Sequence, residues 1–200
     1  MRCAGGRLTA LQLLEERIRK DGKVFPGDVL KVDSFLNHQL DTELLDAVGA
    51  EIAARFSGLG VTKVLTTEAS GIAIACFVAN HLHCPALFAK KAKTSNIADG
   101  VWSAKAHSYT HNNDYTMVVS KEYLTGNDTV LLADDFLANG CALRALLEIC
   151  KKAGAKVVGA GIAIEKEYQG GGNELRAEGL RIESMARIAS MDAEDGISFC

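Results

Sequence analysis

The stretch VLLADDFLANGCA, residues 130–142, decides the fold of this chain. Its apolar run predicts a buried strand, and two adjacent acids, Asp134 and Asp135, follow that run. A small turn that contains Gly140 comes next. Because a buried carboxylate is costly without a partner, this acidic pair is expected either at a solvated strand end or in a binding site.

Predicted strands and helices alternate around this stretch, which is typical of βαβ units and a parallel sheet. The sequence predicts strands at residues 61–67, 85–89, 129–133, 156–166 and 181–188. It predicts helices at residues 8–21, 41–57, 72–80 and 141–153, and a hairpin with arms at residues 101–109 and 115–123. Ligands of such α/β folds bind at the carboxyl ends of the strands, where the acidic pair lies.

Composition restricts the class of protein. Hydrophobic residues make up 48% of the chain and charged residues 24%, with a net charge of −3, so we expect a globular domain without a nucleic-acid partner. We find neither an apolar run of about 20 residues nor a signal peptide, and therefore predict no membrane partner and a cytoplasmic location. The six cysteines have no zinc spacing and are expected to be small apolar fillers, Cys141 excepted.

The turn after the acidic pair suits a phosphate. Small residues let backbone N–H groups approach an anion, and the dipole of the helix that follows favours negative charge there. Carboxylates that hold hydroxyls beside N–H groups that hold a phosphate describe a site for ribose 5-phosphate. The alternative is a solvated acid pair before an ordinary strand-to-helix turn.

The same stretch resembles the phosphoribosyl-pyrophosphate (PRPP) motif of type I phosphoribosyltransferases. It departs from the broad pattern at Asn139, Cys141 and Ala142, where hydroxyls or a second glycine are usual. Together with residues 30–41, 66–73 and 162–166, however, it is similar to the bacterial xanthine phosphoribosyltransferases, in which DDFLANG is the normal form. The resemblance covers about residues 8–199.

This resemblance implies one domain with a central, mostly parallel sheet flanked by helices. Residues 8–40 and about 165–200 would form a small hood, the hairpin a flexible lid, and residues 1–7 a disordered extension. The implied reaction transfers 5-phosphoribosyl from PRPP to N9 of xanthine, giving xanthosine 5′-monophosphate and pyrophosphate. It implies Mg²⁺ held through PRPP, pyrophosphate and water, with no metal site made by the protein alone, and a homodimer.

The resemblance also implies roles for individual residues. Asp134 and Asp135 would bind the ribose hydroxyls or position Mg²⁺ through water. The 5′-phosphate would lie on Ala138, Asn139, Gly140, Cys141 and Ala142. Pyrophosphate would lie on a loop with a strained peptide, formed by Glu68, Ala69, Ser70 and Gly71, and against Lys90, Lys91 and Lys93. The alternatives are an ordinary turn for that loop and a solvated basic surface for those lysines. The lid, residues 94–114, would carry the pair Ser108 and Tyr109.

The purine would be bound in the hood. Leu30 can press on the base, Asn37 offers a donor and an acceptor, and Lys166 can donate to a 6-oxo group but cannot accept from a 6-amino group. Core packing is the favoured role of Phe35. These residues do not decide between xanthine, guanine and hypoxanthine, and xanthine is taken from the resemblance.

Three alternative functions remain open at this point. One is a hypoxanthine/guanine- or adenine-specific phosphoribosyltransferase. Another is a purine regulator that binds PRPP without catalysis, which usually needs a DNA-binding domain or a strongly basic face. A binding protein without PRPP chemistry is the third. His81 and His83 are predicted to be a helix-end pair rather than a metal site.

Overall fold

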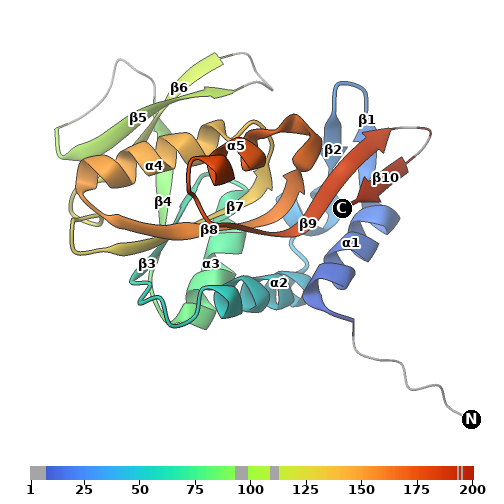
Figure 1. Cartoon of the computed structure of the whole chain (residues 1–200), viewed down its shortest axis with the longest axis horizontal. Helices are drawn as coiled ribbons and strands as arrows, with labels where there is room; N and C mark the ends of the chain where they lie inside the picture. The colour runs from blue at the N-terminus through green and yellow to red at the C-terminus, as the bar shows by residue number, and fades with distance from the viewer. Residues whose placement is uncertain (1–7, 93–98, 109–112, 193, 195) are drawn as a thin grey trace, which may run out of the picture.

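The structure is a computed structural model that describes residues 8–92, 99–108, 113–192, 194 and 196–200. An eight-stranded sheet forms its centre (Figure 1), made of β3 (Lys63–Thr67), β4 (Ala86–Ala92), β5 (Val101–Ser108), β6 (Asn113–Ser120), β7 (Thr129–Leu137), β8 (Lys156–Lys166), β9 (Ile182–Asp192) and β10 (Gly196–Phe199). The strand order is β10-β9-β8-β7-β3-β4-β6-β5. The inner strands β9, β8, β7, β3 and β4 run parallel, as predicted, and the hairpin β5–β6 and strand β10 add antiparallel edges.

Helices cover both faces of the parallel strands (Figure 1), namely α1 (Ala10–Asp21), α2 (Thr42–Arg55), α3 (Gly71–Leu82), α4 (Cys141–Ala153) and α5 (Gly171–Ala177). Strand β7 shows why both faces need cover. Leu131 and Ala133 belong to the core beneath α1, α2 and α3, whereas Val130 and Leu132 belong to the core beneath α4. A strand that is apolar on both faces fits the interior of a parallel sheet.

Several local predictions are confirmed. Helix α4 spans Cys141–Ala153 and ends at Gly154 in the left-handed conformation. At the start of α1 the Thr9 and Gln12 side chains form a capping box, each bonded to the other residue's backbone N–H. The helix predicted at residues 41–57 turns Leu45, Val48, Ile52 and Phe56 into the core, where all four are buried.

Several predicted strand ends are wrong: β9 runs to Asp192 rather than residue 188, β6 ends at Ser120 rather than residue 123, and two further strands, β7 and β4, extend past their predicted ends for a clear reason. Strand β7 was expected to end at residue 133 but continues to Leu137, because β8 pairs with it as far as Leu137 opposite Glu165. Strand β4 continues through Lys90 and Lys91 to Ala92, where a flexible segment was expected, because β6 pairs with it there. Backbone pairing with a neighbouring strand outweighs polar side chains in both places.

Four short elements were not predicted: β1 (Lys23–Phe25), β2 (Val29–Lys31), the π-helical turn η1 (Asp33–Asn37) and the 3₁₀ turn η2 (Glu167–Gln169). Strands β1 and β2 form an antiparallel hairpin. Helix α1 contacts β9 and β10, and β1 contacts β9, so the first described elements lie beside the C-terminal strands at one side of the sheet (Figure 1). Strand β10 was missed as well.

Candidate functional site

The acidic pair lies within strand β7 and is buried. Asp134 is 4% exposed and Asp135 is 7% exposed, and the Asp135 N–H donates to Asp134 Oδ1 at 3.1 Å. Burial and the adjacent Asp135 raise the pKa of Asp134 well above its usual value, with Lys91 acting in the opposite direction. Among the residues that the structure describes, no ion pair reaches Asp134. A solvated strand end is therefore excluded, and the binding-site reading of the pair is favoured.

Gly71, the first residue of α3, gives the Asp134 carboxyl its space. A Cβ at this position would lie 2.5 Å from Asp134 Oδ1 and would also overlap the Thr66 hydroxyl. That hydroxyl is buried and has no hydrogen-bond partner within the described part of the chain. Strands β3 and β7 thus bring an unpaired hydroxyl and a buried carboxyl together beside the start of a helix.

The turn of residues 138–142 leads from β7 into α4. Gly140 has a φ of +78° and is the N-cap of α4, and no side chain caps this helix. The N–H groups of the first helical turn are therefore available to an anion, as the sequence predicted. Cys141 is half-buried at this helix start.

The loop Glu68, Ala69, Ser70 and Gly71 joins β3 to α3, and the peptide bond between Glu68 and Ala69 is cis. The Glu68 carboxylate accepts a hydrogen bond from the backbone N–H of Lys91 at 2.6 Å. This bond links the predicted pyrophosphate loop to β4, which carries the predicted lysines.

Lys91 also links the loop to a residue that the sequence analysis missed. Its Nζ lies 5.2 Å from the centre of the Tyr115 ring, on β6. Burial raises the pKa of Tyr115, and so do the nearby Asp134 and Cys141. Tyr115 therefore lies near enough to Asp134 and Cys141 to sense their charges, and the alternation of β6 was the signal that could have identified it.

Of the other basic and lid residues named from the sequence, the structure describes only Lys90 in full. Lys90 is exposed on β4. Lys93 and Tyr109 lie outside the described residues, and of Ser108 only the backbone, at the end of β5, is described.

A cleft of about 460 Å³ brings the predicted purine residues together. It is lined by Leu30, Asn37 and Lys166, with Gly27, Asp28, Val29, Phe136, Ala138, Asn139 and Gln169. Leu30 comes from β2, Asn37 from η1 and Lys166 from the end of β8, so three separate elements meet here. Ala138 and Asn139 belong also to the phosphate turn, which makes the cleft continuous with it.

Lys166 is held at one wall of this cleft. Its ammonium group donates to the backbone carbonyl of Asp28 and lies 5.7 Å from the centre of the Phe136 ring. Burial lowers the pKa of Lys166, and the charge of Asp28 acts in the opposite direction. The aromatic ring and Asp28 were not predicted, although Phe136 stands in the motif between the acids and the turn.

Other candidates take structural positions. Phe35 is fully buried in the core, as favoured from the sequence. His81 contacts Asp46 at 2.8 Å and His83 ends α3, which confirms the helix-end pair. No group of three metal-ligating side chains occurs among the described residues.

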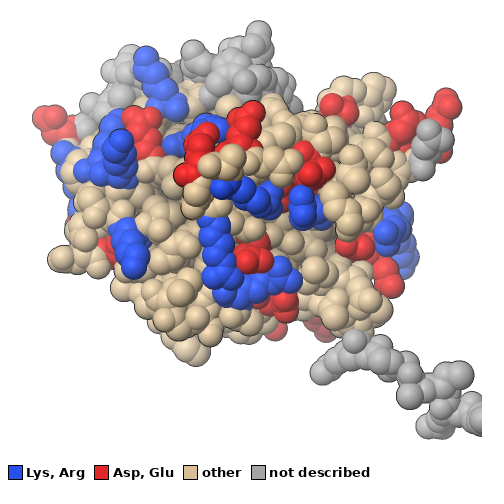
Figure 2. All heavy atoms as spheres, viewed as in Figure 1, with Lys and Arg blue, Asp and Glu red and all other residues tan. Residues whose placement is uncertain are grey.

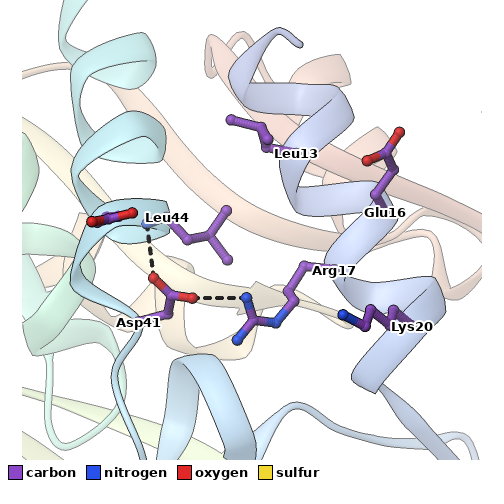
Figure 3. A pocket seen from close by; sticks show the side chains of 7 residues that line it. Leu13, Glu16, Arg17, Lys20, Asp41 and Leu44 are labelled. Atoms are coloured by element: carbon purple, nitrogen blue, oxygen red, sulfur yellow. Dashed lines mark hydrogen bonds and ion pairs between the residues drawn. The ribbon is translucent and has the colours of Figure 1, made fainter. Parts of the chain in front are cut away.

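A second cavity, of about 330 Å³, lies between α1 and α2 (Figure 3) and contains none of the predicted site residues. Its half-buried cation, Arg17, already contacts Asp21 at 2.6 Å and Asp41 at 2.7 Å. The hydrogen bond from the Leu44 N–H, together with Arg17, lowers the pKa of Asp41, although burial acts in the opposite direction. The half-buried charges of this cavity are therefore already paired with each other, whereas Asp134 has no ion pair among the described residues.

The described part of the chain contains no helix long and apolar enough to span a membrane. Its polar groups converge instead on one continuous groove. The cleft with its lysine and amide shares Ala138 and Asn139 with the turn that opens α4, and the buried carboxyl pair lies just before that turn on β7. This arrangement suits a ligand with a phosphate, a hydroxyl-bearing sugar and a planar base.

Comparisons with known proteins agree with this geometry. Residues 38–174 match the model of the phosphoribosyl transferase domain. A xanthine phosphoribosyltransferase of Lachnoclostridium phytofermentans is 52% identical over 93% of this chain and 96% of its own. One of Bifidobacterium adolescentis is 53% identical over 92% and 95%, and one of Listeria monocytogenes is 49% identical over 92% and 96%.

Solved structures share the architecture. The crystal structure of the adenine phosphoribosyltransferase of Giardia lamblia, complexed with 9-deazaadenine, has a TM-score of 0.75 and 25% identity, and the match covers 90% of this chain and 98% of that one. That of Rhodothermus marinus has a TM-score of 0.72 and 23% identity, covering 89% and 98%.

Proposed function

The chain belongs to the phosphoribosyl transferase domain family, and from this premise we propose that it is a purine salvage enzyme for xanthine. It transfers the 5-phosphoribosyl group of PRPP to N9 of xanthine, and the products are xanthosine 5′-monophosphate and pyrophosphate. Relatives that carry the name xanthine phosphoribosyltransferase are about half identical over nearly the whole chain, which supports this substrate.

The observation that carries the proposal is the purine cleft. Leu30, Asn37 and Lys166, chosen from the sequence, line one cleft that shares two residues with the phosphate turn. A base in this cleft has its sugar directed toward the acidic pair. Asn37 can pair with a 2-oxo group as donor, and Lys166 can donate to a 6-oxo group, so the two exocyclic oxygens of xanthine both find a donor.

The residues of the groove then divide the reaction between them. The turn of residues 138–142 binds the 5′-phosphate, and Asp134 and Asp135 hold the ribose hydroxyls. The loop of residues 68–71 and Lys91 hold the leaving pyrophosphate. As the bond from C1′ to pyrophosphate breaks, positive charge develops at C1′, and the buried carboxyl pair stabilises it. The contribution of the protein is mainly positioning and electrostatics.

Mg²⁺ fits this site as a companion of the substrate. The described residues supply a pair of carboxyl groups and no larger cluster of ligands. That suits an ion that takes most of its ligands from phosphate oxygens and water. When bound, it would neutralise charge on the pyrophosphate while Asp134 or Asp135 positions it through water.

A panel of bases tests the proposal. Xanthine, hypoxanthine, guanine and adenine are each incubated with PRPP and Mg²⁺, and nucleotide formation is followed by chromatography, with Asp135→Asn and Lys166→Met beside the wild type. We expect preferred conversion of xanthine, a strong loss in Asp135→Asn, and a KM for xanthine raised by about 10-fold or more in Lys166→Met. Lys156→Met, an exposed lysine at the other end of β8, is the matched control and should change nothing.

The same panel separates the alternatives. Preferred conversion of guanine, hypoxanthine or adenine would keep the reaction and reject xanthine as the substrate. PRPP binding without turnover of any base would favour the regulator. Figure 2 shows basic and acidic side chains intermixed over the described residues of one face, which does not favour nucleic-acid binding by that face. A homodimer and a cytoplasmic location stay predictions, and gel filtration tests the first.

A further inference from the structure

The short helix α5 packs directly against the phosphate turn. The N–H of Gly171, its first residue, donates to the carbonyl of Ala138 at 3.2 Å. A Cβ on Gly171 would overlap the Ala138 oxygen and the Asn139 carbonyl carbon and would lie 2.6 Å from the Gly140 nitrogen. Any side chain at this position must therefore displace the turn. Leu175 of the same helix closes on the turn too, 3.0 Å from the point where a Gly140 Cβ would lie.

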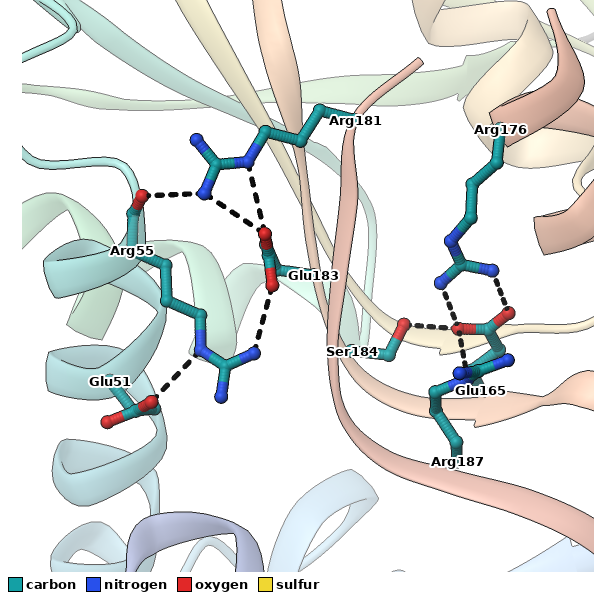
Figure 4. Close-up of polar contacts among 8 residues, drawn as sticks. All are labelled: Glu51, Arg55, Glu165, Arg176, Arg181, Glu183, Ser184 and Arg187. Atoms are coloured by element: carbon teal, nitrogen blue, oxygen red, sulfur yellow. Dashed lines mark hydrogen bonds and ion pairs between the residues drawn. The ribbon is translucent and has the colours of Figure 1, made fainter. Parts of the chain in front are cut away.

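A buried ion pair holds α5 in place (Figure 4). Glu165 of β8 is fully buried and accepts two hydrogen bonds from Arg176 of α5, each of 2.7 Å, and a further one from the Ser184 hydroxyl. Burial alone would raise the pKa of Glu165, but Arg176, Ser184 and Arg187 outweigh it and hold that pKa below its usual value. A helix of seven residues is not stable by itself, so this anchor fixes its position.

Glycine also permits the anchor itself. A Cβ on Gly172 would overlap the Glu165 carboxylate and lie 2.9 Å from Arg176 Nη1. Consecutive glycines of GGG, residues 170–172, thus have separate contacts: Gly171 touches the phosphate turn and Gly172 touches the ion pair. The sequence predicts a loop with one helical turn or more at residues 170–179, and α5 confirms the helical part, but the pattern gave no sign of these contacts.

We propose that Gly171, held by the Glu165–Arg176 pair, is a positioning residue for the 5′-phosphate of PRPP. This inference rests on the proposed function, because it concerns the phosphate end of the same site. Backbone N–H groups bind one phosphate together only when they converge on it, and the loss from a small displacement is large. The Ala138 carbonyl bond and the close contact with residues 139 and 140 set that convergence before any ligand arrives.

Two ligand fragments test this role without the reaction. Ribose 5-phosphate carries the 5′-phosphate, whereas pyrophosphate with Mg²⁺ binds at the loop of residues 68–71. In Gly171→Ala we expect the Kd for ribose 5-phosphate and the KM for PRPP to rise by about 10-fold or more, while the Kd for pyrophosphate changes by less than about 2-fold. The control is Gly126→Ala, since a Cβ there meets its nearest atom at 3.5 Å, in ordinary contact, and both Kd values should stay unchanged.

A second variant covers the case in which Gly171→Ala does not fold. Arg176→Lys keeps the charge but loses the two-pronged bond to Glu165, and it should shift the Kd for ribose 5-phosphate in the same direction by about 3-fold. Equal losses for both fragments would indicate a general structural defect and overturn the proposal, and so would an unchanged Kd for ribose 5-phosphate in both variants.

The wild-type protein separates this inference from the proposed function. If it binds ribose 5-phosphate but converts no base, the proposed function fails while the comparison of fragments still decides the role of Gly171. If it binds no ribose 5-phosphate at all, no phosphate end exists and the positioning role is overturned.

Discussion

Two buried carboxyl groups on neighbouring strands have opposite surroundings. Glu165 on β8 is met by two nitrogens of Arg176 and the hydroxyl of Ser184. Asp134 on β7 accepts the N–H of Asp135 and has no ion pair in the described part of the chain. Burial raises the pKa of both groups. The partners of Glu165 nevertheless bring the pKa of Glu165 below its usual value, whereas the pKa of Asp134 stays well above the usual value of an aspartate.

The difference shows where this chain uses carboxyl groups for stability and where it keeps them for a ligand. The cost of burying Glu165 is offset inside the protein, so Glu165 stabilises the fold. Asp134 has no such partner among the described residues, and we propose that ribose hydroxyls or a hydrated cation offset the cost of its burial. Buried carboxyl groups with raised pKa values and no ion pair are typical of functional sites, because there local stability is given up for binding.

Loss of the Glu165 side chain should have the largest effect on stability. In Glu165→Ala we expect the free energy of unfolding to fall by about 2–3 kcal/mol, because the half-buried Arg176 loses its partner and the buried Ser184 hydroxyl loses its acceptor. Urea denaturation followed by circular dichroism measures it. The control is Glu178→Ala, whose 56%-exposed side chain pairs with Arg144 at 2.8 Å and should contribute at most about 1 kcal/mol. Equal losses in both variants would contradict the assigned role of Glu165.

The two glycines that make room for these carboxyl groups should separate stability from activity. Gly172→Ala should lower the free energy of unfolding by about 1–3 kcal/mol, since the new Cβ overlaps Glu165. Gly71→Ala should lower kcat/KM strongly, while its free energy of unfolding should fall by less than that of Gly172→Ala. The reason is that the new Cβ would lie 2.5 Å from Asp134 Oδ1 and would displace a carboxyl group that we propose catalysis needs. Unfolding curves and kcat/KM on both variants check this, and an active Gly71→Ala enzyme would break the comparison.

The pH dependence of stability should show the smallest effect, with opposite signs for the two groups. The lowered pKa of Glu165 gives stability that is present above its usual value of 4.5 and is lost as the pH falls through the folded-state pKa. The raised pKa of Asp134 gives stability that is present below its usual value of 3.8 and is lost as the pH rises through the folded-state pKa. The excess in free energy of unfolding of the wild type over Glu165→Gln should therefore shrink toward pH 3, by about 1 kcal/mol. Relative to Asp134→Asn, the wild type should become less stable toward pH 7, also by about 1 kcal/mol. Parallel unfolding curves at all pH values would contradict both assignments.

The sequence predicted the parallel core, helix α4 and three residues that line the cleft, Leu30, Asn37 and Lys166. Regular hydrophobic spacing and the glycine after residue 153 were sufficient for α4. The residues of the cleft came from the resemblance, which includes the hood. The match to the family model begins at residue 38 and contains neither Leu30 nor Asn37.

The missed elements depend on tertiary contacts. Strands β1 and β2 have three residues each, too few for a periodic signal, although Pro26-Gly27-Asp28 marks a turn. The extension of β7 past Asp134 depends on pairing with β8, and Tyr115 meets the site only through the hairpin. The role of GGG needed the Glu165–Arg176 pair, whose members are eleven residues apart.

The most direct test is Asp134→Asn, compared with the wild type by thermal unfolding with and without PRPP and Mg²⁺, and by xanthine turnover. We expect the unliganded variant to be at least as stable as the wild type, because the buried charge is gone. It should lose most of the stabilisation by PRPP, and its kcat/KM should fall by about 10-fold or more. A variant that is several kcal/mol less stable without ligand but gains as much from PRPP as the wild type would contradict the account.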